Sequence, residues 1–250
     1  MSEPYRYEKG PNGEPIPVTA FQEVRMWTQE LVSWLGCGSR AADRELGFVQ
    51  VSSHSRQVVR DQVWLRIIQF DATASDVLPL TEARKLTQAR AGWRNDELPF
   101  NERGTYSNYG PAFALLRQRI DEDLDRLRRD TWTPNRPAVF FLTDGKPSDD
   151  PAWRQEYRAL RDLGNAEEPG IVALGFGESV PAVLSSVGTR SHGGRAYQSK
   201  SESGLGVVGP LFRYIANSIA SSVKAGELCP SDDDADLNAG YSPVRPLTGY

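Results

Sequence analysis

The chain has 250 residues, of which 39% are hydrophobic and 25% charged, with a formal net charge of -4 and a pI near 5.4. This is the composition of an ordinary globular protein. It predicts no positive surface of the strength that attracts nucleic acid or anionic lipid, so we expect neither as a partner.

The N-terminal stretch is polar and lacks the apolar core of a signal peptide, and no segment approaches the roughly 20 apolar residues of a membrane span. We therefore expect a cytoplasmic protein. No linker divides the middle of the chain, which favours one domain over residues 17–226. This domain is flanked by an N-terminal arm, 1–16, and an acidic tail, 227–250, expected to be disordered because it has little apolar content.

Cysteines and histidines are scarce, which limits the chemistry. Cys37 and Cys229 are far apart and form neither a disulfide framework nor a zinc pattern. The two histidines, His54 and His192, stand in polar or glycine-flanked contexts typical of surface residues, which argues against a Ser-His-acid triad.

Hydrophobic spacing predicts alternating helices and strands, with residues 39–63 ambiguous. The predicted helices are 18–35, 111–129, a helix starting at Pro151, 180–187 and 204–224. The predicted strands are 63–71, 76–80, 137–143, 170–177 and 195–198. Strands that are apolar on both faces and alternate with helices indicate an α/β fold with a mostly parallel, helix-covered sheet.

Asp144 follows the apolar run of residues 137–143, so this strand delivers a carboxylate to the carboxyl edge of the sheet, where such folds bind ligands. An Asp-Gly pair is also common in turns, and this alternative stays open. A second loop offers the hydroxyls of Thr105 and Ser107 just before a helix. Hydroxyl and carboxylate oxygens suit Mg²⁺, which keeps several waters and takes few protein ligands.

Several stretches together resemble the von Willebrand factor type A (VWA) family. They are "WLRIIQFDATASDVLPL", "SNYGPAFALLRQRI", "RPAVFFLTDGKPSDDPAW" and "NGEPI" followed by an amphipathic helix. The chain is most similar to the bacterial intracellular type associated with tellurite and stress resistance, over about residues 13–225. The resemblance implies a doubly wound, Rossmann-like sheet, a Mg²⁺ site at its top, and binding of a protein partner without catalysis.

The resemblance assigns two metal ligands. Ser107 stands where the family has a threonine, with Thr105 as the alternative in another register, and Asp144 stands at the family's last aspartate. A carboxylate of the partner would complete the shell of Mg²⁺ or Mn²⁺. The residues expected to face the partner are Tyr106, Asn108, Tyr109, Gly145, Lys146 and Asp71.

The family's first motif, Asp-x-Ser-x-Ser at the end of the first central strand, is missing. "YRYEKGPN" occupies its place before "GEPI", with Glu8 as the nearest carboxylate. Metal binding is therefore expected to be weak or absent. The first central strand is expected to be atypical or absent too, which would leave two sheet edges without partners. Either the chain is truncated, or another segment such as residues 47–60 fills the place.

Three functional hypotheses follow. The first is a VWA-type binding or scaffold module with a degenerate metal site. The second is a metal-dependent hydrolase with Asp144 as ligand or nucleophile, although the strand ends in a single aspartate and no phosphate-binding glycine loop is present. The third is a metal-free structural pseudo-domain in a larger assembly.

Overall fold

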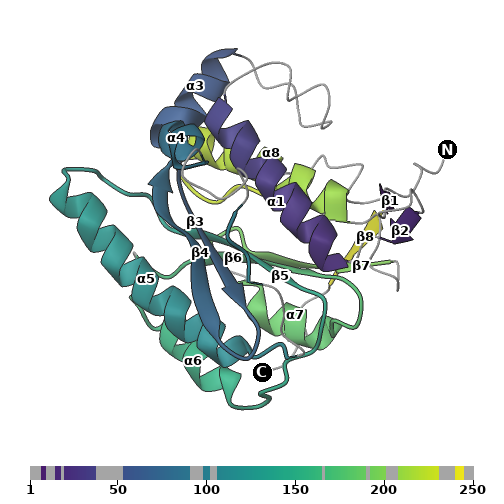
Figure 1. The fold of residues 1–250 in the computed structure, drawn as a ribbon. Helices are drawn as coiled ribbons and strands as arrows, with labels where there is room; N and C mark the ends of the chain where they lie inside the picture. Colours follow the sequence, from purple (N-terminus) through teal and green to yellow (C-terminus); the bar gives the residue numbers. More distant parts are fainter. Residues whose placement is uncertain are drawn as a thin grey trace.

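The computed structural model has a mixed α/β fold with helices on both sides of the central strands (Figure 1). It describes residues 7–9, 15–17, 20–37, 53–90, 98–101, 106–164, 167–189, 192–200, 208–230 and 240–244. The strands are β1 Tyr7–Lys9, β2 Pro15–Pro17, β3 Trp64–Phe70, β4 Ala74–Glu82, β5 Ala138–Thr143, β6 Gly170–Gly175, β7 Arg195–Ser199 and β8 Tyr241–Pro243. The helices are α1 Ala20–Cys37, α3 Ser53–Gln62, the 3₁₀ turn η1 Ala83–Lys85, α4 Leu86–Arg90, α5 Tyr109–Arg129, α6 Trp153–Arg161, α7 Pro181–Val187 and α8 Val208–Ala225.

The main sheet has the strand order β5-β6-β7-β8. β5, β6 and β7 run parallel, with Ala138 opposite Gly170 and Thr143 opposite Gly175, and β8 adds antiparallel to β7. Every residue of β6 is buried. Its continuous apolar run therefore fits a strand covered by helices on both faces, as the sequence predicted.

Two hydrophobic cores fill the two sides of the sheet. The first packs α1 and α8 against β3, β4 and one face of the main sheet, around residues such as Leu35, Leu174 and Phe212. The second packs α5, α6 and α7 against the opposite face and is rich in aromatic rings, among them Phe113 and Trp153. Figure 1 shows α1 and α8 on one side of the strands, and α5 and α6 on the other.

β3 and β4 form a separate antiparallel hairpin. The predicted strand 63–71 is confirmed, and the second strand is longer than the predicted 76–80. Within the described part of the chain, β3 is hydrogen-bonded to β4 only and β5 to β6 only. The hairpin is thus held to the rest of the fold by side chains and not by a continuous sheet.

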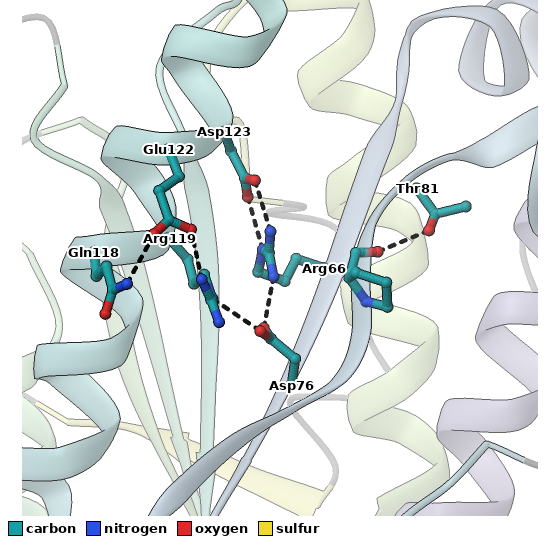
Figure 2. A network of polar contacts seen from close by, with 8 residues as sticks. Arg66, Asp76, Thr81, Gln118, Arg119, Glu122 and Asp123 are labelled. Carbon is teal, nitrogen blue, oxygen red and sulfur yellow. Dashed lines mark hydrogen bonds and ion pairs between the residues drawn. The ribbon is translucent and has the colours of Figure 1, made fainter.

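An ion-pair network fastens this hairpin to α5 (Figure 2). Arg66 on β3 donates two hydrogen bonds to Asp123 of α5, at 2.7 and 2.6 Å, and one to Asp76 of β4 at 2.6 Å. Arg119 of α5 donates to the other oxygen of Asp76 at 2.8 Å and to Glu122 at 2.5 Å. The Arg66, Asp76 and Asp123 side chains are only 15 to 20% exposed, so these charges depend on one another for solvation.

Two segments differ from expectation, and the structure adds detail to the N-terminal arm. Residues 53–60, proposed as a strand, lie in helix α3, which places Val59 in the first core near α8; residues 47–52 lie outside the described residues. In the arm, Tyr7 to Lys9 pairs with Pro15 to Pro17 as a short hairpin.

The tail also differs, because residues 241–243 form β8 on the edge of β7, and Leu228 and Tyr241 are buried in the first core. A few apolar side chains suffice to order a short segment when a sheet edge offers backbone partners. None of the helices in the described ranges combines the length and the apolar character needed to cross a membrane.

Candidate functional site

Three loops meet at the carboxyl ends of β3 and β5, and we call residues 71–73, 106–108 and 144–149 the three-loop surface. The first two loops are joined by backbone contacts. The Asn108 amide donates to the Asp71 carbonyl at 2.9 Å, and the Asn108 side chain donates to the Ala72 carbonyl at 3.2 Å. The Asp71 carboxylate is already used, because it accepts from the Thr73 amide at 2.8 Å within its own turn.

The second and third loops are joined by a reciprocal pair of hydrogen bonds. The Ser107 amide donates to the Ser148 hydroxyl, and the Ser148 amide donates to the Ser107 carbonyl, each at 3.1 Å. Asp149 then accepts from the amides of Tyr109 and Gly110, at 3.0 and 2.7 Å. A carboxylate from a loop distant in sequence therefore satisfies the open N-terminal amides of α5 and stabilises its positive end.

Tyr109 supports the site from inside the protein. It was expected to face a partner, but only 1% of it is exposed, because its ring lies among Phe70, Phe113, Phe141 and Trp153. Its hydroxyl donates to the Gly145 carbonyl at 2.8 Å and lies 3.0 Å from the Thr143 hydroxyl. Tyr109 thus fixes the backbone that follows Asp144.

This burial makes the stability of the site sensitive to alkaline pH. Burial, and to a lesser extent the charges of Asp144 and Asp149, raise the pKa of Tyr109 to about 12. In the unfolded chain the Tyr109 hydroxyl ionises near its ordinary pKa of about 10. Between about pH 10 and 12 the unfolded state therefore loses this proton before the folded state does, and the free energy of unfolding falls. In Tyr109→Phe this loss is absent. We expect the difference in free energy of unfolding between wild type and variant to narrow by about 2 to 3 kcal/mol from pH 9 to pH 12.

Urea unfolding at a series of pH values measures this difference. The matched control is Tyr106→Phe, since Tyr106 is 58% exposed and carries the same hydroxyl in the adjoining loop. If the difference in free energy of unfolding from wild type narrowed equally for both variants, this would contradict the role assigned to the buried hydroxyl.

The two predicted ligands, Ser107 and Asp144, lie in neighbouring loops of the three-loop surface. A Cβ added to Gly145 would come within 2.9 Å of the Ser107 hydroxyl oxygen, so this hydroxyl lies against the backbone next to Asp144. Among the described residues, neither the Ser107 hydroxyl nor the Asp144 carboxylate has a hydrogen-bond partner. Thr105, the alternative ligand, lies outside the described residues.

These donors fit a divalent cation only in part. One hydroxyl and one carboxylate would hold Mg²⁺ or Mn²⁺ with most of its shell as water. The described ranges contain no group of three or more His, Cys, Asp or Glu side chains arranged to hold a metal ion. Such a donor set would make a weak, open cation site, or a surface that recognises a hydrogen-bond donor.

Of the remaining residues predicted to face the partner, Tyr106 and Lys146 are exposed, as is the predicted ligand Asp144. Asn108, Gly145 and Asp71 are half-buried, and Asn108 and Asp71 hold the loops together. Sequence reasoning missed Asp149 and Ser148, which carry most of the contacts between loops. Their only signal was the density of polar residues after the strand, which does not say which helix end they approach.

Comparison with protein-family models, with curated proteins and with solved structures found no match to this chain.

Proposed function

We propose that this chain is a non-enzymatic, VWA-type protein-binding module that engages its partner through the three-loop surface, assisted by a weakly held Mg²⁺ or Mn²⁺. The proposal rests on the position of the surface at the carboxyl end of β5, a strand of the mostly parallel sheet, because α/β sheets bind ligands at this edge. It includes a doubly wound arrangement with the first central strand missing, in keeping with the separate hairpin β3–β4.

One observation carries the proposal: two carboxylates of the surface are already used in hydrogen bonds within the protein, and one is available to a ligand. Asp71 and Asp149 are committed to backbone amides, while Asp144 and the Ser107 hydroxyl have no partner among the described residues. An exposed carboxylate and an unpartnered hydroxyl thus stand on neighbouring loops that hydrogen bonds hold in place, where they are available to an external cation or donor.

The surroundings favour a protein ligand over a small substrate. Tyr106 offers an exposed aromatic ring and Lys146 an exposed cation beside Asp144, and exposed aromatic residues are frequent in protein interfaces. A carboxylate on the partner would complete the shell of the bound cation and would also pair with Lys146.

Titration of Mg²⁺ or Mn²⁺ into the metal-stripped protein should raise its melting temperature by mass action. At a metal concentration ten times the dissociation constant the stabilisation is about 1.4 kcal/mol, or roughly 3 to 5 °C for a chain of this size. We expect Asp144→Asn to abolish this shift. The matched control is Asp150→Asn, which removes the same charge from the end of the same loop, where Asp150 accepts from Trp153 and Arg154.

Two results would contradict the proposal. The first is no shift at 10 to 20 mM metal, or an equal shift in Asp144→Asn. The second is metal-dependent hydrolysis of p-nitrophenyl phosphate that disappears in Asp144→Asn, because this would assign Asp144 to catalysis.

A further inference from the structure

β3 and β5 run in the same direction but belong to separate sheets, and we call the space between their two facing edges the gap. At their carboxyl ends both reach the three-loop surface, and the rings of Phe70 and Phe141 stack at 5.4 Å. At the amino end of β3, Trp64 packs edge-on against Trp132, with ring centroids 6.0 Å apart, and Trp132 precedes β5 in the chain. The two strands therefore run parallel without being hydrogen-bonded to each other.

The backbone of β5 shows which groups point into this gap. The carbonyls of Pro137 and Thr143 accept from the amides of Gly170 and Phe176, so the odd-numbered residues of β5 point towards β6. Because peptide groups alternate along a strand, the even-numbered residues point the other way. Ala138, Phe140 and Leu142 thus direct their backbone groups into the gap and have no described partner.

The backbone of β3 presents a matching edge. The Val63 carbonyl and the Asp71 amide both bond towards the hairpin partner, at 2.8 Å each. The residues of β3 that direct backbone groups into the gap are Trp64, Arg66, Ile68 and Phe70, again without a described backbone partner. Unpaired backbone groups between two covered faces are costly, and one further strand would satisfy both edges.

The side chains around the gap are apolar on both faces. Leu65, Ile67, Phe140 and Leu142 turn towards the first core, and Phe70, Val139 and Phe141 towards the second. Yet no residue of β3 is fully buried, whereas all of β6 is. The side chains of β3 beside the gap are therefore less completely covered than those of β6 in the main sheet.

We propose that this gap binds a bare extended segment of about six residues from another polypeptide, inserted parallel to β3 and β5 and apolar at successive positions. A strand inserted here must offer both of its edges, one to β3 and one to β5. The edge strand of a folded sheet has only one free edge, so a second copy of this domain does not fit. Phe70 and Phe141 already touch, so the inserted residue at their level must be small.

The strand β6 supplies a sequence suited to test this. It pairs in parallel with the other edge of β5 and places Ala173 opposite Phe141. The probe is therefore a synthetic peptide, Gly-Ile-Val-Ala-Leu-Gly with two lysines at its amino end for solubility, carrying a fluorophore. Binding to the full chain is followed by fluorescence anisotropy in EDTA, which separates this test from that of the metal site.

We expect saturable binding that weakens at least about tenfold when two alternate amides of the peptide are N-methylated, because the side chains stay and only one edge of hydrogen bonds is lost. A peptide with phenylalanine in place of alanine should bind more weakly by a similar factor. Amide hydrogen exchange locates the bound peptide. Exchange of the Phe140 and Leu142 amides should slow about tenfold on binding, while exchange of the Val139 and Phe141 amides, which already bond to β6, should not change.

Three outcomes would overturn the proposal. No binding at millimolar peptide would do so, as would equal affinity of the N-methylated peptide, which indicates mere hydrophobic adhesion. The third is exchange at Phe140 and Leu142 in the free protein as slow as at Val139 and Phe141, because the gap would then be closed by the chain itself.

Discussion

Replacing Phe113 with alanine is expected to lower the free energy of unfolding by about 3 to 5 kcal/mol. Phe113 is 1% exposed and, like Tyr109, contacts both β5 and α6 from helix α5. It stacks on Phe141 at 5.4 Å and packs against Trp153 and Tyr157 at 6.0 and 5.1 Å. Its removal loses the free energy of transferring the ring out of water. It also leaves a cavity among rigid rings that cannot close together, which adds a second cost.

Urea unfolding measures this loss, and Phe113→Leu is the matched variant because it keeps much of the volume. We expect it to cost clearly less than alanine, since leucine retains many of the contacts. The alanine variant should also show a smaller Mg²⁺ shift, because Tyr109, which holds the loop after Asp144, packs edge-on against Phe113. A loss below 1 kcal/mol would mean that the aromatic cluster does not hold α5 against the sheet.

The second large effect is expected for Arg66→Met, at about 2 to 4 kcal/mol of lost stability. Arg66 neutralises Asp76 and Asp123, and its removal leaves Asp123 in a partly buried position without its cation, while Asp76 keeps Arg119 (Figure 2). Because no described strand joins β3 to β5, this network also fixes the hairpin to α5. Increased amide exchange over β3 and β4 should accompany the global loss.

The double variant Arg66→Met/Asp123→Leu separates charge from packing. If the cost of the single variant arises from an uncompensated charge, removal of both partners should recover a good part of it. Arg128→Met is a suitable control, since Arg128 pairs with Glu167 near the surface and its loss should cost less than about 1 kcal/mol. A double variant less stable than the single one would show that Asp123 stabilises the fold by other contacts.

The sequence determined the central strands and helices of this protein, because their patterns depend on local rules. The buried run of β6 and the apolar stripe of α5 appear as predicted. So does the strand that delivers Asp144 to the carboxyl edge. Hydrophobic periodicity reports how many faces of an element are covered, and this information is present in each segment by itself.

Only the tertiary structure decided how these elements share their partners. It turned residues 53–62 into helix α3, because Val59 finds a place against the first core, and it ordered residues 241–243 on the edge of β7. Tyr109 became an internal support of the site, and Asp149 became the cap of a helix that precedes it by 40 residues. Such roles arise from backbone groups that are left unpaired at helix ends and sheet edges, and which segment satisfies them depends on positions in space that no local pattern encodes.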